Sequence, residues 1–156
     1  MLPCSVNVLY MNDAARELYA GQGGLCYATP QSAGLDLRAC FAQEVADIAP
    51  GQRLGVPTGL AMAPCQPGVA GFVYARSGLG AVQGLTVAQG VGLIDPDYRG
   101  EIRVFLLNTS DSIKHLRRGE RMAQIVFQPY FRAELTVVDA LESTERGAGG
   151  FGHSGR

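Results

Sequence analysis

Charged residues are scarce in this chain, and lysine is nearly absent. Only 17% of the 156 residues are charged, the formal net charge is -1, and Lys114 is the one lysine among 13 basic residues. A chain without a general positive field is not expected to bind nucleic acid or an anionic membrane through bulk charge. The remaining basic residues are arginines, which can hold phosphate oxygens through paired hydrogen bonds, so local anion sites stay possible. A bias in base composition explains the excess of arginine equally well.

Metal-binding and targeting patterns are missing too. The chain has four cysteines and two histidines, and no two cysteines form a C-x-x-C pair, so the sequence does not support a zinc site. Residues 1–4 carry no basic charge ahead of a long apolar core, and no apolar window reaches the length of a membrane span. We therefore expect a reduced, cytoplasmic protein without a signal peptide or a membrane-spanning segment.

Short apolar runs, separated by turn residues, dominate the rest of the sequence. With 47% hydrophobic residues, 21 glycines and 8 prolines, the chain suits one domain with a substantial core and many strands. One short helix is predicted at 14–20, where Asp13 would be the N-cap and Gly21 the stop. The predicted fold class is all-β, a sandwich or jelly roll. Its strands are expected at 5–11, 35–40, 44–48, 53–57, 69–75, 85–94, 102–108, 122–130 and 135–138.

A carboxylate closes one of these runs at a position where a structural strand has little use for it. Asp95 follows an apolar run and precedes Pro96, which favours an extended conformation before a type I turn. A second apolar run begins near Glu101, so we predict a strand, a tight turn and a strand. This hairpin would hold Asp95 at the rim of a sheet beside Tyr98. Alternatively, Asp95 and Asp97 are ordinary turn formers.

Two further segments place polar groups where an anion could bind. Asp36 and Arg38 alternate with apolar neighbours and would share one face of a strand, although a solvated outer face explains them as well. Arg76, Ser77 and Gly78 follow another strand in a turn rich in small residues. Such a turn can offer backbone N–H groups, a hydroxyl and a guanidinium to one anion, although a simple capped turn is the other interpretation.

The last third of the chain adds a glutamine and a glycine-rich tail. Gln124 stands among apolar residues of a predicted strand, so its amide must find partners in neighbouring loops or in a ligand. Residues 146–155 look superficially like a phosphate loop, yet they lack its lysine and the helix that follows it. Their composition predicts a flexible tail. Arg146 and Phe151, set within so much glycine, suggest that the tail folds down over a ligand.

Taken together, these segments resemble the trimeric dUTPase family (deoxyuridine 5'-triphosphate nucleotidohydrolases), and its bacterial members in particular. The resemblance runs from Ser32 to the C-terminus, leaves 13–24 without a role, and implies a distorted jelly-roll β-sandwich or barrel with one short helix. It also implies a single domain over 1–156, whose C-terminal arm at 144–156 closes over the active site. Each motif alone is weak, but five in order with matching spacing are specific. They lie at 33–39, 75–80, 92–101, 119–127 and 146–155.

The resemblance also implies a function. Members of the family hydrolyse dUTP to dUMP and pyrophosphate with Mg²⁺, which keeps uracil out of DNA and supplies dUMP for thymidylate synthesis. The resemblance further implies a cytoplasmic homotrimer that shares each active site among three chains. Its partner is then the small-molecule substrate dUTP, rather than a nucleic acid or a membrane.

The chemistry at the phosphates would come from the first four motifs. Asp95 would activate the water that attacks the α-phosphorus, on the side opposite the leaving pyrophosphate. Asp36 would hold Mg²⁺ through a water molecule, because this ion keeps several of its waters. The implied phosphate contacts are Arg76, Ser77 and Gly78, together with Gln124 from the neighbouring subunit.

The nucleoside would be read by the predicted hairpin and the tail. Backbone hydrogen bonds along the hairpin would recognise uracil, because cytosine presents a donor in place of O4 and leaves polar groups unmatched. Tyr98 would pack against the deoxyribose and leave no space for a 2′-hydroxyl. Phe151 would stack on uracil, and Arg146 would clamp the γ-phosphate as the tail closes. The other implied substrate contacts are Gln89, in place of an asparagine in many relatives, Gly92, Leu93, Ile94, Arg103 through its backbone, and Gly150.

Three alternatives remain. A dCTP deaminase resembles this fold and also binds a deoxynucleoside triphosphate in a trimer, but it needs a glutamate that acts on C4 of the base, and its central motif differs from 92–95. A catalytically silent nucleotide-binding module would be favoured by the loss of Asp95 or of the tail motif, and both are present. A jelly-roll binding domain unrelated to nucleotides would require the five motifs to arise by chance.

Overall fold

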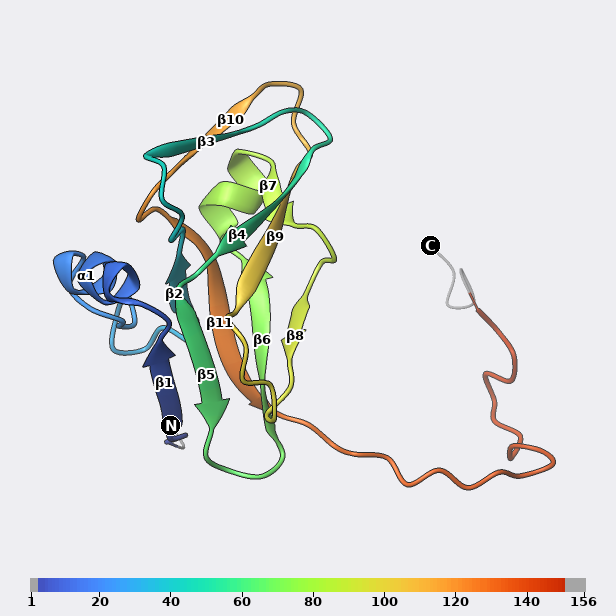
Figure 1. Cartoon of the computed structure of the whole chain (residues 1–156). Coiled ribbons are helices and arrows are strands. Elements are labelled where there is room, and N and C mark those ends of the chain that lie inside the picture. The colour runs from blue at the N-terminus through green and yellow to red at the C-terminus, as the bar shows by residue number, and fades with distance from the viewer. Residues whose placement is uncertain (1–2, 151–156) are drawn as a thin grey trace.

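Antiparallel strands build the body of the protein, and helix α1 packs at its edge (Figure 1). The structure, a computed structural model, describes residues 3–150. Besides α1 (Asp13–Gly21), it contains one turn of π-helix, η1 (Gly78–Val82). The strands are β1 (Val6–Tyr10), β2 (Leu35–Arg38), β3 (Val45–Ile48), β4 (Arg53–Pro57), β5 (Leu60–Pro64), β6 (Val69–Ala75), β7 (Leu85–Val87), β8 (Gly92–Ile94), β9 (Arg103–Asn108), β10 (Lys114–Arg117) and β11 (Arg121–Pro129).

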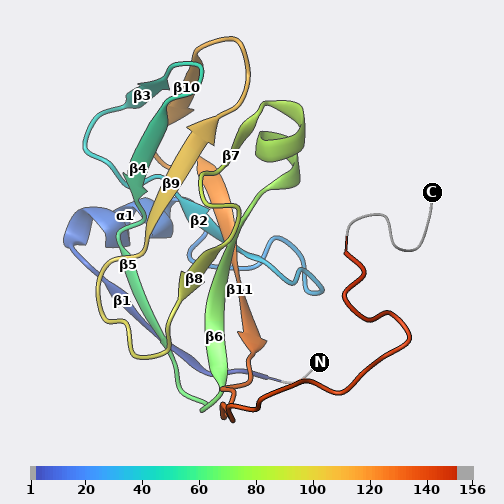
Figure 2. The same ribbon diagram turned by 90° about the vertical axis from the view of Figure 1, so that its right-hand side faces the viewer.

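The strands form two main sheets and two smaller pairs. One main sheet has the order β2-β11-β6-β8, and the other has the order β4-β9-β7. β1 pairs with β5, and β3 pairs with β10. Every strand pairing within the described residues is antiparallel. The predicted all-β jelly roll is therefore confirmed, and Figure 2 shows its sheets from a second side.

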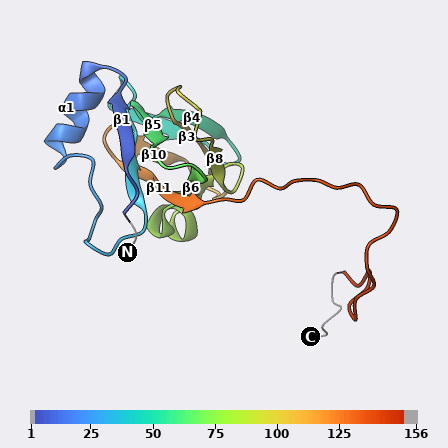
Figure 3. The ribbon, with the colours of Figure 1, turned by 90° about the horizontal axis from the view of Figure 1, so that it is seen from below.

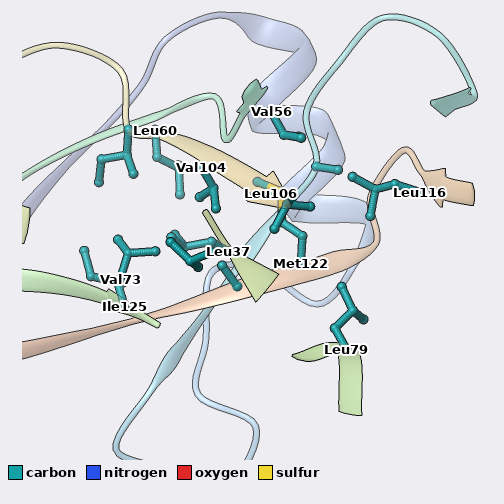
Figure 4. Close-up of a cluster of buried hydrophobic side chains, with 14 of the residues drawn as sticks. Leu37, Val56, Leu60, Val73, Leu79, Val104, Leu106, Leu116, Met122 and Ile125 are labelled. Atoms are coloured by element: carbon teal, nitrogen blue, oxygen red, sulfur yellow. The ribbon is translucent and has the colours of Figure 1, made fainter. Parts of the chain in front are cut away.

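The core lies between the two main sheets, because each strand turns alternate apolar side chains inward. Val104 and Leu106 of β9 are buried, whereas Phe105 between them is exposed. The buried pair belongs to one cluster with Leu37 and Ile125, which come from the other sheet (Figure 4). This packing fixes β2, β6 and β11 relative to one another. The same strands carry the polar residues described below.

The N-cap of helix α1 lies one residue before the predicted one. The N-cap is Asn12, whose side chain accepts a hydrogen bond from the Ala15 N–H at 2.8 Å. The prediction of Asp13 as the cap is therefore wrong: the extended backbone lies at Asn12, and Asp13 has already joined the helix, where its charge suits the first turn. Near the other end, the hydroxyl of buried Tyr19 accepts a bond from the Arg38 N–H at 3.1 Å.

Most predicted strands are present, but two predicted runs need correction and two strands were not predicted. The run at 85–94 divides into β7 and β8, because the chain turns at Gly90, whose N–H donates to the Val87 carbonyl at 2.9 Å. β5 and β10 were not predicted, because β5 is apolar without alternation and β10 is mostly polar. Residues 135–138 form no strand. They find no partner strand in the body, and Leu135 and Val137 are 91% and 98% exposed.

A long arm leaves the body after β11. Tyr130 is still tied to the body, because its N–H donates to the Gly68 carbonyl at 2.9 Å. Every residue from 131 to 150 is exposed, and Figures 1 and 3 show this arm running away from the sheets. The exposed segment thus begins earlier than the predicted boundary at 144. Within residues 3–150, no helix is long and apolar enough to span a membrane.

Candidate active site

Three of the sequence motifs meet in one pocket of about 270 Å³. They meet because β11 lies between β2 and β6, so that Gln124 stands opposite Asp36 on one side and opposite Tyr74 on the other. Arg76 follows two residues after Tyr74 and therefore points to the same face. The pocket is lined by Ala28, Ser32, Ala33, Gly34, Asp36, Arg76, Ser77 and Gln124.

Asp36 is held between two arginines at this pocket. One carboxylate oxygen lies 2.8 Å from Arg76 Nε, and the other lies 3.1 Å from Arg121 Nη1. Arg76 Nη1 also donates to the Arg121 carbonyl at 3.2 Å. The Asp36 side chain is only 12% exposed, so these pairs are partly screened from water. The three side chains together carry one net positive charge, which suits a phosphate group.

The contacts of Arg76 decide which of its atoms can meet an anion. Its Nε and Nη1 bind Asp36 and the Arg121 carbonyl. Its remaining nitrogen, Nη2, has no hydrogen-bond partner within the described residues. The side chain is about a quarter exposed and lines the pocket. Asp36 therefore orients the guanidinium and leaves one edge for a ligand.

The amide of Gln124 is oriented in the same pocket. Its Nε2 donates to the Ala75 carbonyl at 3.1 Å, so the side chain has the partner that a half-buried amide needs. Its Oε1 lies against Gly34, where a Cβ would collide with the amide. Gly34 thus permits this close approach, and Gln124 stays at the rim of the pocket.

Ser77 lines the pocket, and Gly78 follows it where β6 gives way to η1. Both residues are exposed. Ser77 precedes η1, and its hydroxyl makes no capping hydrogen bond. The turn is therefore not the simple side-chain-capped turn that the sequence allowed. The Ser77 hydroxyl can bind an anion beside Arg76.

Asp95 directly follows β8 and begins a tight turn, as predicted. The Tyr98 N–H donates to the Asp95 carbonyl at 3.1 Å, which closes the turn around Pro96 and Asp97. Arg99 Nη1 donates to the carbonyls of Pro96 and Tyr98, at 2.8 and 3.0 Å. The turn is therefore stiffened by its own arginine, and the carboxylate of Asp95 stays exposed.

The predicted hairpin around this turn is wrong in one respect. β8 pairs with β6, whereas β9 pairs with β4 and β7, so the two arms belong to different sheets. The segment from 95 to 102 is thus a connection between sheets rather than the tip of a two-stranded ribbon. Sequence signals for a turn cannot distinguish these two cases, because both have the same local conformation.

Asp95 lies far from the pocket within one chain. In the register of β6 with β8, Ile94 stands opposite Gly71, so Asp95 follows opposite Ala70. Arg76 lies six residues further along β6 (70 to 76), which is about 20 Å at the usual rise of a strand. In Figure 1, η1 lies beyond one end of β6 and the β8–β9 connection lies near the other end. One chain therefore presents two half-sites.

The other predicted contacts divide between these half-sites and the arm. Near Asp95, Leu93 is exposed, and the Gln89 amide lies over buried Gly92. Arg103 turns its side chain to protein groups, since Nη2 donates to the Gly55 carbonyl at 3.2 Å. In the exposed arm, Arg146 Nε bonds only locally, to the Gly149 carbonyl at 2.9 Å. Gly150 ends the described part of the chain, Phe151 lies outside it, and Ile94 is half-buried.

Two residues of these half-sites, Arg121 and Glu101, were not singled out by the sequence analysis. Arg121 is one of several arginines near the start of β11, and only the pairing of β11 with β2 shows that it reaches Asp36. Glu101 appears in the sequence as the first residue of an apolar run, but its carboxylate binds the Gly59 N–H at 2.8 Å. A charged residue bordering a buried run is the signal that could have indicated Glu101, whereas no such signal marks Arg121 out among the neighbouring arginines.

The chain is similar to proteins of one known family. A family model described as dUTPase matches residues 24–155. The deoxyuridine 5'-triphosphate nucleotidohydrolase of Photorhabdus laumondii is 50% identical over 130 residues, which cover 83% of this chain and 85% of that protein. A mutant dUTPase of Staphylococcus bacteriophage 80alpha, solved with dUpNHpp, has a TM-score of 0.82 at 23% identity and covers 97% of this chain and 99% of its own.

A second solved structure supports the fold alone. The dUTPase of phage phi11 of S. aureus, in a mutant form described for its coordination of a structural Mg(II) ion, has a TM-score of 0.73 at 19% identity. It covers 89% of this chain and 99% of its own. The family match extends over most of the chain, and half of the aligned residues in the bacterial relative are identical. This protein therefore belongs to the dUTPase family.

Proposed function

We propose that the protein hydrolyses dUTP to dUMP and pyrophosphate. The observation that carries this proposal is the pocket in which Asp36 orients Arg76 beside Ser77 and Gln124. These groups offer a guanidinium edge, a hydroxyl and an amide to a chain of phosphates. The 80alpha dUTPase, with which the chain shares its fold, was solved with dUpNHpp. Hydrolysis of dUTP would remove a precursor of uracil in DNA and supply dUMP, and we expect it to occur in the cytoplasm.

The active site would be shared between chains of a homotrimer. Asp95 and the phosphate pocket lie about 20 Å apart in one chain, which is too far for both to act on one triphosphate. A neighbouring chain would therefore supply Asp95 to the pocket. The arm supports this arrangement, because Phe131, Leu135 and Val137 are almost fully exposed and would be covered in an assembly. A third chain would contribute Arg146 and Phe151 through its arm.

Asp95 would act as the general base. An in-line displacement at the α-phosphorus needs a carboxylate that orients and deprotonates water on the side opposite the leaving pyrophosphate. Asp95 stands at the end of a strand on a turn stiffened by Arg99, so its position is well defined. Ser77 and the Nη2 edge of Arg76 would meet the charge that develops on the phosphate oxygens. The new bond forms between phosphorus and the water oxygen as the bond to pyrophosphate breaks.

Mg²⁺ would enter this site together with the triphosphate. Residues 3–150 hold no cluster of three or more His, Cys, Asp or Glu side chains that could bind a metal by themselves. Mg²⁺ does not require one, because it commonly binds substrate phosphates and keeps several waters. Each oxygen of Asp36 already accepts a bond from an arginine and can accept one more, so Asp36 fits a bond from a metal-bound water. When bound, the ion would neutralise charge on the phosphates.

The nucleoside would lie along β8 and the turn that follows it. Leu93 and Tyr98 are exposed on this segment, and backbone groups near Gly92 and Ile94 would read uracil, with Gln89 and Arg103 beside them. Tyr98 would exclude a 2′-hydroxyl by packing against the deoxyribose. The closing arm would place Phe151 on the base, with Gly150 allowing the bend.

The test is pyrophosphate release with Mg²⁺ from dUTP, dCTP, dTTP and UTP in parallel. Release from dUTP alone is the expected result, because only dUTP combines uracil with deoxyribose. Ammonia release from dCTP would indicate a deaminase instead. Silence with all four nucleotides, from a folded protein that still binds dUTP, would indicate a binding module.

A further inference from the structure

The segment that carries Asp95 and Tyr98 is tied to the body of the protein at its end, through the backbone of Ile102 and the side chain of Glu101. Most side-chain hydrogen bonds of the segment from 95 to 102 remain within it, as those of Arg99 and Tyr98 do. The carboxylate of Glu101 is different. Its Oε1 accepts a hydrogen bond from the N–H of Gly59, 42 residues away, at 2.8 Å.

Gly59 gives this bond a structural reason. It stands between β4 and β5 with a φ of +71°, in the left-handed region, so its N–H is turned away from strand pairing. The Glu101 carboxylate satisfies this donor and is only about a quarter exposed. Its second oxygen lies 3.7 Å from Arg103 Nη1, a long contact that adds charge attraction rather than a fixed geometry.

The backbone of Glu101 in turn fixes Tyr98. The Tyr98 hydroxyl donates to the Glu101 carbonyl at 3.0 Å, and the ring lies over Gly100, where a Cβ would collide with the hydroxyl. The tyrosine is 45% exposed, so packing alone does not hold the ring in one orientation. Its orientation depends on where the Glu101 backbone lies. That backbone is held from two sides: the Glu101 carboxylate binds Gly59, and the N–H of the next residue, Ile102, donates to the Leu60 carbonyl at 2.8 Å.

From this chain of contacts we infer that Glu101 is a positioning residue for Tyr98 and thereby sets the preference for deoxyribose over ribose. The inference rests on the proposed function, in which Tyr98 faces the sugar. Glu101 touches no substrate atom in this account. It acts by holding the carbonyl that anchors the Tyr98 hydroxyl, because a loosened ring would leave room for a 2′-hydroxyl.

The experiment measures the KM and kcat for dUTP and the inhibition constant of UTP, in the wild type and in Glu101→Ala, Glu101→Gln and Glu101→Asp. We expect Glu101→Ala and Glu101→Asp to lower the ratio of the UTP inhibition constant to the dUTP KM by about tenfold, because neither side chain reaches Gly59. The side chain of Glu101→Gln keeps an oxygen that can still reach the Gly59 N–H, so this ratio should stay within about threefold of the wild-type value. The matched control is Gln52→Ala, which removes a side-chain bond to the Ala49 N–H, also at 2.8 Å, in a remote turn.

Two further comparisons separate positioning from general destabilisation. In a Tyr98→Phe background, which already lacks the bond to the Glu101 carbonyl, Glu101→Ala should change the selectivity much less than in the wild type. If Glu101→Ala does not fold, the Asp and Gln variants carry the same test. Unchanged discrimination in folded Glu101→Asp, or equal loss in Glu101→Gln, would overturn the inference. A wild type that does not hydrolyse dUTP would instead overturn the proposed function.

Discussion

At the scale of residues, the proposed phosphate pocket depends on Asp36, whose carboxylate binds two arginines. Asp36 fixes Arg76 through Nε, and Arg121 binds the other carboxylate oxygen. A single Asp–Arg contact leaves the carboxylate able to rotate, whereas two contacts on opposite oxygens do not. Arg121 thus orients Arg76 through Asp36, and the backbone carbonyl of Arg121 also accepts a hydrogen bond from Arg76.

Replacing Arg121 with alanine should weaken substrate binding more than turnover. The loss of one partly exposed, charge-assisted bond to Asp36 predicts a KM for dUTP raised by about tenfold, with kcat changed much less. Steady-state kinetics of Arg121→Ala measure this, with Arg53→Ala on β4 as the control for removal of an arginine. A KM within about twofold of the wild type would show that Arg76 needs no help from Arg121.

The sequence supports many of these residues but not their contacts. The motif positions of Asp36, Arg76, Ser77 and Gln124 are readable from the chain, and the structure brings all four into one pocket. Arg121 could not be singled out, because its role depends on the register of β11 against β2. For the same reason, the sequence could not show that both oxygens of Asp36 are bound by arginines.

At the scale of elements, helix α1 is attached to the sheet through Tyr19. The tyrosine is fully buried, and its hydroxyl accepts the Arg38 N–H at the end of β2. Burial raises the pKa of Tyr19 to about 12. The same segment had no role in the sequence analysis. Its structural role is to cover the end of β2, two residues from Asp36.

Tyr19→Phe should reduce the loss of stability at high pH. The folded protein holds the Tyr19 proton more tightly than the unfolded chain, whose tyrosines ionise near pH 10. This contribution to stability is complete below about pH 10 and is lost as the pH rises towards about 12, by at most about 1.4 kcal/mol per pH unit. Urea unfolding at several pH values in this range gives the free energy of unfolding against pH, and this plot should have a shallower slope for Tyr19→Phe than for wild type. Exposed Tyr27→Phe is the control, and equal slopes in all three proteins would contradict the prediction.

Elements with clear alternation and clear turns were predictable from the sequence, and the others were not. β9 alternates between buried and exposed residues and lies where expected. β5 is apolar at every position and β10 is mostly polar, so neither carries the two-residue period of a half-buried strand. Residues 135–138 have strand composition, but a strand needs a partner, and no strand within residues 3–150 pairs with them.

At the scale of the whole molecule, the proposed sharing of the active site would make activity a property of an assembly. A mixture of Asp95→Asn and Arg76→Ala chains, refolded together, should regain activity that neither variant has alone. If each site takes its pocket and its base from different chains, about a quarter of the sites in a random mixture are intact. Activity assays on the mixed and separate variants test this. No recovery in a trimer that has exchanged its chains would place both groups in one chain.

The arm belongs to the same scale. Deletion of residues 146–156 removes Arg146 and the glycine-rich segment without touching the core, so the protein should fold and assemble normally. Its kcat/KM for dUTP should fall by about a hundredfold or more, because closure no longer excludes water or clamps the γ-phosphate. Size-exclusion chromatography and thermal unfolding provide the controls. Normal hydrolysis by the shortened protein would contradict closure by the arm.

The most direct measurement of the central claim compares dUTP binding and turnover in wild type and Asp95→Asn. The amide keeps the size of the side chain and leaves the turn intact, because the turn is closed through the Asp95 carbonyl. We predict that Asp95→Asn binds dUTP within about threefold of wild type while its single-turnover release of pyrophosphate falls by about a thousandfold. Release within about tenfold of the wild-type rate would show that Asp95 is not the general base.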